Sequence, residues 1–344
     1  MAEDFRWVSS ASQPATPVND VQSSGSQPAT PVNDVKSAAT EPVPSLPPHE
    51  DGSCCDLGCE ASSCRGIVAS FGLDSFKGIS DGDFQSNFGA VTGLNAALPV
   101  PGLRNYGLGW QLGMSYGVYD FDGRDSSFEH QAQSQEQIFI TTGFFHKAEG
   151  DRRLSYGLVY DWMINNNWGE FGTAPTLGQW RGQIEYTLSG SNAVGVWGCL
   201  RDLRSQQSTY NVYGLPAFVQ TRGVDQVNFF WHHKFTAGAD TWLWTGFPDR
   251  GSLSRDGSLG NWMVGARVEV PLSERLALYA NGSYFHPTAS AGADASISSG
   301  YDVSMGVTWY FGGNACSPSI NGACGVPYMP VANNSTFLVD QSAR

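Results

Sequence analysis

The chain has 344 residues, a formal net charge of −13, 15% charged residues and 12% aromatic residues. Its acidity argues against a nucleic-acid partner, because no basic stripe is present to neutralise phosphates. No run approaches the ~18 consecutive apolar residues that a membrane-spanning helix needs, so any membrane span must consist of strands.

Residues 1–53 are rich in Pro, Ser, Ala and Thr and contain a tandem repeat, 9–22 and 23–36. This leader cannot bury enough apolar area to offset the entropy of ordering, so we predict that it is disordered. We interpret it as an inert linker, with a periplasmic tether as the alternative. The first residues, Ala2, Glu3 and Asp4, do not form the basic and apolar stretches of a secretory signal, although an exported barrel needs one.

Six of the seven cysteines lie outside the predicted strands, and Cys199 lies within one. Residues 54–66, with four of the six, are interpreted as a collar before the first strand, and residues 312–344 form a tail with the other two. Cysteines in an exported protein favour disulfides, although the pairing stays open. Zinc is less favoured, because adjacent cysteines are poorly spaced for tetrahedral coordination. The disulfide candidates are Cys54, Cys55, Cys59, Cys64, Cys316 and Cys324.

Twelve strands are predicted between residues 67 and 311. The last one shows the pattern most clearly: Val303, Met305, Val307 and Trp309 alternate with small or polar residues. Period two means a strand with one apolar and one polar face. Most of the strands have the length that crosses the hydrocarbon layer when tilted. Their ranges are 67–76, 88–98, 108–119, 137–145, 154–162, 179–188, 193–203, 226–235, 241–247, 261–270, 276–285 and 301–311.

The polar faces of these strands carry mainly Gly, Ser and other small residues rather than the Lys, Glu and Arg of a soluble surface. Long and short connections also alternate from the third strand to the twelfth, as in membrane barrels, where periplasmic turns are tight and outer loops are free to grow. The short ones are 147–153, 189–192, 236–240 and 271–275, and the long ones are 120–136, 163–178, 204–225, 248–260 and 286–300.

These patterns predict an all-β chain: a closed antiparallel up-and-down transmembrane β-barrel of about 12 strands behind a disordered N-terminal leader. The alternative is a soluble β-sandwich with a binding role, in which the apolar faces pack against each other. Good solubility without detergent would favour the sandwich.

Several charged residues fall on the inward faces of neighbouring strands. They could form a constriction that sets the selectivity of a pore, or they could pair with one another and fill the lumen. The sequence leaves both possibilities open. The candidates are Arg181, Glu185, Arg201, Lys234, Arg267, Glu269 and Asp302.

No catalytic or metal site is predicted. His232 and His233 point to opposite faces of one strand and cannot bind one ion together. The outward histidines, His146 and His233, have no serine clearly placed beside them, so we expect no enzyme. Residues 120–129 carry four carboxylates, but their spacing departs from the calcium-binding loop, and a solvated acidic loop is favoured. No cofactor is expected.

The alternation, the loops and the aromatic end Val307-Thr308-Trp309-Tyr310-Phe311 resemble bacterial outer-membrane β-barrels, in which a terminal strand ending in Phe is the usual assembly signal. Here a tail of 33 residues follows Phe311, which departs from that pattern. Ser70–Lys77, Asn87-Phe88-Gly89 and the Gly-rich third strand resemble a planctomycete barrel family of unknown function. This resemblance covers about residues 65–312 and implies the architecture rather than a substrate.

The function hypothesis is a passive, porin-like channel for small hydrophilic solutes in the outer membrane. The expected partners are the lipid bilayer, the barrel-assembly machinery and those solutes. The alternatives are a plugged structural or surface barrel that contacts cell-wall material, and the soluble binding protein named above.

Overall fold

The computed structural model describes residues 66–81, 86–100, 108–121, 124–125, 130–131, 134–148, 152–169, 171–210, 216–253, 259–287, 299–312, 315–317, 320 and 326–343. The predicted leader and nearly all of the predicted collar lie outside these residues. The described part of the chain contains no helix that is both long and apolar enough to cross a membrane.

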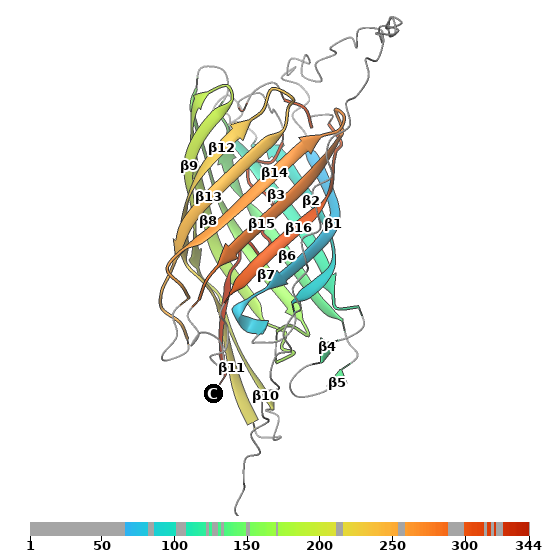
Figure 1. Ribbon diagram of the computed structural model, residues 1–344, viewed down its shortest axis with the longest axis vertical. Helices are drawn as coiled ribbons and strands as arrows, with labels where there is room; N and C mark the ends of the chain where they lie inside the picture. The colour runs from blue at the N-terminus through green and yellow to red at the C-terminus, as the bar shows by residue number, and fades with distance from the viewer. Residues whose placement is uncertain are drawn as a thin grey trace, which may run out of the picture. The chain divides into compact units, whose positions relative to one another are not determined.

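Twelve antiparallel strands close into one barrel (Figure 1), as the sequence predicts. Each strand pairs with its sequence neighbours among the twelve, and β1 closes the cylinder by pairing with β16. The barrel strands are β1 (Ile67–Lys77), β2 (Asn87–Pro99), β3 (Leu108–Tyr119), β6 (Gln135–His146), β7 (Leu154–Asn166), β8 (Thr176–Ser189), β9 (Asn192–Arg201), β12 (Gln226–Lys234), β13 (Asp240–Pro248), β14 (Met263–Pro271), β15 (Leu276–Phe285) and β16 (Gly300–Tyr310).

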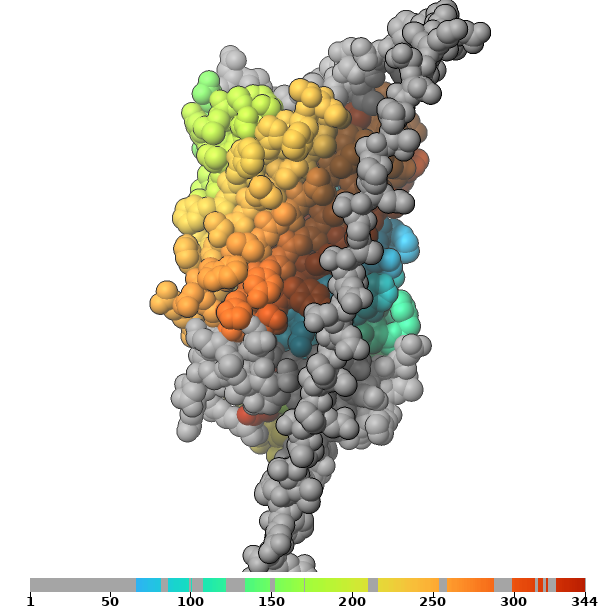
Figure 2. Space-filling view, viewed as in Figure 1, coloured from blue at the N-terminus to red at the C-terminus, as the bar shows by residue number. Residues whose placement is uncertain are grey.

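The outer wall of the barrel is apolar and the inner wall is polar. Phe71 of β1 and Met305 of β16 are 59% and 57% exposed, whereas the inward Gln111 and Asp161 are fully buried. All twelve barrel strands contribute exposed large apolar side chains. Figure 2 shows the outer surface of the strands coloured yellow to orange, from which some of these side chains project. A soluble sandwich buries this face, so the arrangement excludes the sandwich alternative and fits a lipid environment.

The two ends of the barrel differ. Short connections join β6 to β7, β8 to β9, β12 to β13 and β14 to β15, and we call this the short-turn end. The opposite, long-loop end carries longer connections, among them residues 202–225 and 249–262. A 3₁₀ turn, η1 (Ile79–Asp81), and the short strand pair β4 (Arg124–Asp125) and β5 (His130–Gln131) belong to these connections.

A second sheet lies at the long-loop end, where the sequence predicts a loop and a tail. It has the order β10–β11–β17, with β10 (Arg204–Tyr210), β11 (Pro216–Gly223) and β17 (Val339–Ala343). The loop between β9 and β12 therefore contains a hairpin, and the end of the chain adds a strand to it. Alternation with polar residues is too weak in β10 and β17 to reveal either strand from sequence.

Candidate functional site

The polypeptide passes through the inside of the barrel after its last wall strand. At the short-turn end the Ala315 amide donates to the Glu274 carbonyl, and the Ile320 amide donates to the Gly190 carbonyl. Residues 326–343, the C-terminal segment, then contact the inner wall and end in β17, which pairs with β11 at the long-loop end. The segment therefore runs from one end of the lumen to the other.

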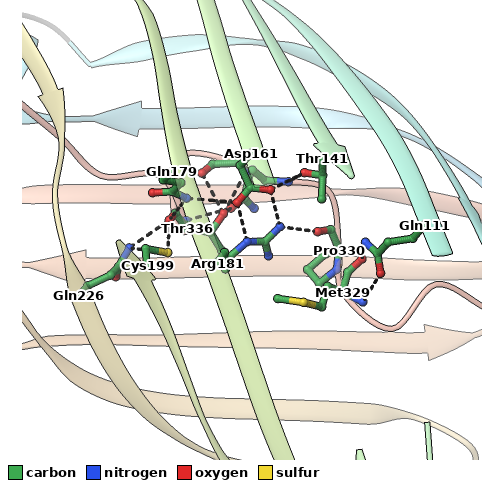
Figure 3. A network of polar contacts seen from close by, with 12 residues as sticks. Gln111, Thr141, Asp161, Gln179, Arg181, Cys199, Gln226, Met329, Pro330 and Thr336 are labelled. Carbon is green, nitrogen blue, oxygen red and sulfur yellow. Dashed lines mark hydrogen bonds and ion pairs between the residues drawn. The ribbon is translucent and has the colours of Figure 1, made fainter. Parts of the chain in front are cut away.

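Side chains of the wall bind the main chain of this segment (Figure 3). The Gln111 carboxamide accepts from the Met329 amide at 3.1 Å and donates to the Met329 carbonyl at 2.9 Å. The Arg181 guanidinium donates to the next carbonyl, that of Pro330, at 2.8 Å. Because these contacts come from β3 and β8, the segment is tied to separate parts of the wall.

The Thr336 carbonyl is a second attachment point. It accepts from the amides of Gln179 and Gln226 at 3.1 and 3.0 Å and from the Cys199 thiol at 3.3 Å. These donors come from β8, β12 and β9, which are neighbours in the wall. A carbonyl with this many donors is well compensated for its loss of water.

A buried ion pair lies beneath the segment. The Asp161 carboxylate accepts two hydrogen bonds from Arg181, at 2.7 and 3.0 Å, and one from Thr141 at 2.7 Å. The side chains of Arg181 and Asp161 are 2% and 0% exposed. Two parallel bonds fix the guanidinium plane, so Asp161 orients the group that holds Pro330.

Glycines in the wall leave room for the segment. A Cβ on Gly113 would come within 2.5 Å of a Val331 methyl carbon, and a Cβ on Gly157 would come within 2.9 Å of the Met329 sulfur. A larger residue at either position would therefore force these side chains of the segment to move. Gly113 and Gly157 are among the small inward residues that suggest an open pore, yet side chains of the C-terminal segment fill the space beside them.

Apolar side chains seal the lumen at the long-loop end. Phe337 and Val339 of the segment pack with Trp168 and Met163 in one buried cluster. A second cluster joins Leu338 to side chains from five separate connections and strands, namely Ile79, Val224, Leu259, Met263 and Phe285. Among the described residues, these two clusters place apolar packing across this end of the lumen.

The end of the segment is anchored by Asp340 in β17. Its carboxylate accepts from the Leu253 amide at 2.7 Å and from the Ser252 hydroxyl at 3.2 Å, and it pairs with Arg222 at 3.1 Å. Burial raises the pKa of the Asp340 carboxyl above its ordinary value, although the Leu253 amide and the Arg222 guanidinium oppose this shift.

A cavity of about 350 Å³ remains inside the barrel beside residues 326–333. One side of it is the segment, including Tyr328 and Met329. The other sides carry aromatic and charged residues of the wall, among them Trp197, Phe230, Trp242, Trp244, Lys234 and Arg267.

The charges around this cavity are paired with one another. His232 lies between Glu185 and Asp240, with ring nitrogens 2.8 and 3.1 Å from their oxygens, and Lys234 also binds Asp240 at 2.6 Å. The Trp242 ring stacks on His232 at 4.2 Å, and the Arg267 guanidinium lies 5.0 Å from the same ring. These lateral contacts follow the strand register, in which His232, Trp242 and Arg267 are successive cross-strand neighbours.

Six of the seven charged candidates from the sequence lie on the inner wall. Arg267 pairs with Glu269 at 3.0 Å, and Asp302 binds the Ser335 hydroxyl of the segment. The seventh, Arg201, lies at the rim and is about one-third exposed, where it pairs with Asp225 and Asp249 of the long loops. The inward charges therefore form pairs and hold the segment rather than one open ring.

Disulfides find no support in the described residues. Neither Cys199 nor Cys316 forms one, and the Cys316 thiol donates to the Ser273 carbonyl at 3.8 Å. The other candidates, Cys54, Cys55, Cys59, Cys64 and Cys324, lie outside the described residues. So do most of residues 120–129, the acidic loop. No cluster of His, Cys, Asp and Glu suited to a metal occurs in the part of the chain that is described.

The outward His233 does have serines nearby, at the short-turn end. Its Nδ1 lies 3.0 Å from the Asn192 side-chain oxygen, and the Asn192 amide donates to the hydroxyls of Ser189 and Ser191. The asparagine thus lies between serine and histidine, whereas a hydrolytic triad needs the histidine bonded directly to the serine. This geometry supplies no activated nucleophile.

The role of the tail, and of the residues that bind it, was not predicted from the sequence. Four inward glutamines from four strands contact the segment: Gln111, Gln137, Gln179 and Gln226. A carboxamide both donates and accepts, so it can satisfy both the N–H and the C=O of a peptide main chain. The recurrence of glutamine on inward positions was the available signal.

Solved outer-membrane proteins share the barrel architecture at low identity. An outer membrane channel from Pseudomonas putida F1 is 9% identical, with a TM-score of 0.45, over 76% of this chain and 98% of that chain. The toluene transporter TodX from Pseudomonas putida is 11% identical, with a TM-score of 0.38, over 71% and 89%. The outer membrane phospholipase of Salmonella typhi is 10% identical, with a TM-score of 0.39, over 70% and 90%.

No curated protein sequence matches the chain. The model of a family of unknown function, DUF6666, matches residues 66–339. This range includes the whole barrel and the C-terminal segment up to the first residue of β17, so the protein belongs to the DUF6666 family.

Proposed function

We propose that the protein is an outer-membrane β-barrel channel that its own C-terminal segment holds closed. The observation that carries this proposal is the passage of residues 326–343 through the lumen, with hydrogen bonds to β2, β3, β6, β8, β9 and β12. A passive pore needs a free path, and here the path is filled. The apolar wall supports residence in a bilayer, and strands alone supply the span.

In this proposal the solute is small and hydrophilic and passes only when the segment leaves the wall. The cavity, lined by paired charges and by aromatic side chains, gives such a solute a site that opens after displacement of one side. The barrel-assembly machinery remains the proposed route of insertion, and no catalytic activity is proposed.

The second candidate is a structural barrel that displays its loops and C-terminus. The β10–β11–β17 sheet favours it, because the last strand is fixed at the long-loop end together with a hairpin. In that case the lumen would stay closed permanently.

Solute flux into proteoliposomes tests these proposals. The full chain should be tight to small sugars, because the lumen is occupied. Gly113→Leu should raise sugar flux at least tenfold if the segment is a gate, since the new side chain meets Val331. The matched control is Gly182→Leu, because a Cβ on Gly182 has no neighbour closer than 3.8 Å. A full chain that passes sugars freely would contradict closure, and a tight Gly113→Leu barrel would favour the structural candidate.

A further inference from the structure

The wall holds the C-terminal segment through its main chain at four residues, in addition to contacts with its side chains. Eight hydrogen bonds join wall side chains to main-chain atoms of Met329, Pro330, Ala332 and Thr336. All of the wall groups involved are side chains, namely those of Asn95, Gln111, Thr141, Gln179, Arg181, Cys199 and Gln226 (Figure 3 draws most of them). Such contacts recognise the main chain of a peptide whatever side chains it carries at these four positions.

The geometry at Met329 is that of a peptide site. One carboxamide, that of Gln111, both donates to and accepts from the same residue, while Asn95 donates to the same carbonyl at 3.0 Å. β-Strand addition satisfies a peptide in the same two-way manner, with side-chain sites added for specificity. Here the buried Met329 and Phe337 side chains supply those sites.

Residues 328–333 are also open on one side. The segment contacts the wall at Asn95, Gln111, Thr141 and Arg181, whereas the cavity lies between it and the opposite wall, which carries Trp242 and Arg267. The space beside this part of the segment is therefore not filled by a strand of the barrel.

We propose that the inner wall is a binding site for a peptide segment, and that residues 326–343 are an exchangeable internal ligand of that site. The proposal rests on the closed lumen described under the proposed function. It goes beyond closure, because it assigns a ligand class, a polypeptide segment with a turn at residues 333–337, to the lumen. Another peptide entering from the short-turn end would compete for the same carboxamides.

The test uses the full chain with a protease recognition sequence in place of residues 321–325, cut after folding in detergent micelles. The probe is a fluorescent synthetic peptide with the sequence 326–344. The nicked barrel, which should keep its heat-modifiable gel mobility, should take up the probe saturably, and unlabelled peptide should compete. A probe that carries an N-methyl group on the Met329 amide cannot donate to Gln111 and should bind about tenfold more weakly.

A matched pair of variants separates recognition from general stability. Gln111→Ala should speed release of the probe about tenfold, since two bonds to the segment are lost. Gln207→Ala is the control, because the Gln207 carboxamide makes the same two-way pair with Ala174 but lies in β10, away from the segment. Gln179→Ala, which loses the bond to Thr336, provides a second variant should Gln111→Ala fail to fold.

Two binding results would overturn the proposal: a nicked barrel that keeps its original segment and admits no probe, and a nicked barrel that loses the segment and never binds the probe. Equal release rates of the probe from the Gln111→Ala and Gln207→Ala variants would also overturn it. Failure here is distinguishable from failure of the proposed function. If the uncut barrel is tight to sugars but the nicked barrel does not exchange its segment for the probe, only the peptide site is refuted. If the uncut barrel leaks sugars, closure is refuted.

Discussion

Asp161 and Arg181 show how a charge can be placed in the middle of a barrel that spans a membrane. Removing two charges from water is costly, and the cost is offset only when the geometry is good and other hydrogen bonds are satisfied. Here Thr141 and Gln179 donate further hydrogen bonds to the Asp161 carboxylate. The Arg181 guanidinium donates one to the Pro330 carbonyl. The pair therefore couples the wall to the C-terminal segment.

Replacing Arg181 by alanine should lower the free energy of unfolding by about 3–5 kcal/mol, because the Asp161 carboxylate would stay buried without its cation. The double variant Arg181→Met with Asp161→Leu should recover most of this loss. The measurement is the urea midpoint, followed by heat-modifiable gel mobility.

Arg201→Ala is the control for that experiment, since its two ion pairs at the rim are about one-third exposed and should contribute at most about 1 kcal/mol. If Arg181→Ala lowered the free energy of unfolding no more than Arg201→Ala, the buried pair would contribute no more to stability than the pairs at the rim.

At the scale of elements, the strands could be predicted and the C-terminal segment could not. Each barrel strand carries its own period-two pattern, and neighbours in sequence pair in space, so the local pattern fixes the element. The contact between Gln111 and Met329 instead joins residues 218 positions apart. Between Tyr328 and Leu338 the segment forms no strand, and its conformation depends on the wall.

The charged candidates were predicted on the correct face, but their partners were not. The alternation of β8 places Arg181 and Glu185 inward, yet which carboxylate meets Arg181 depends on the register between β7 and β8. A single sequence does not contain that register. For the same reason Arg201 could not be separated from the lumen residues, because only the end of β9 places it at the rim.

The docking of β17 should weaken as the pH rises. Burial raises the Asp340 pKa above 3.8, so the docked strand binds more protons than a released one between 3.8 and the raised value. Docking is therefore strongest below pH 3.8 and loses stability as the pH passes through the raised pKa. Hydrogen-exchange protection factors of residues 339–343, which correct for intrinsic rates, would measure this.

Asp340→Asn should remove most of that pH dependence, because the amide does not titrate. Protection of β17 that increased with pH in the unmodified chain would contradict the assigned direction.

At the scale of the whole molecule, the apolar wall and the filled lumen have different origins. The wall follows from alternation in all twelve strands, and it places the large side chains against lipid. The lumen is filled by a separate stretch of chain that returns through the cylinder after β16. Both termini of a bare twelve-stranded barrel lie at one end, and the C-terminal segment moves the last described residues to the other.

A charge on the lipid-facing wall should destabilise the protein only if that wall meets lipid. Phe71→Arg in β1 should cost about 2–4 kcal/mol in bilayers. Phe218→Arg, at a residue of similar exposure in β11 of the long-loop sheet, should cost less than about 1 kcal/mol. Folding titrations in lipid vesicles would compare the two, and equal costs would contradict the proposed span.

The most direct test of the threaded segment is the sidedness of three epitope tags, placed after Arg344, within residues 211–215 between β10 and β11, and within residues 149–151 between β6 and β7. In sealed proteoliposomes the first two tags should be accessible to antibody from the same side, and the third from the opposite side. A tag after Arg344 that shares its side with the tag in residues 149–151 would contradict passage of the chain through the barrel.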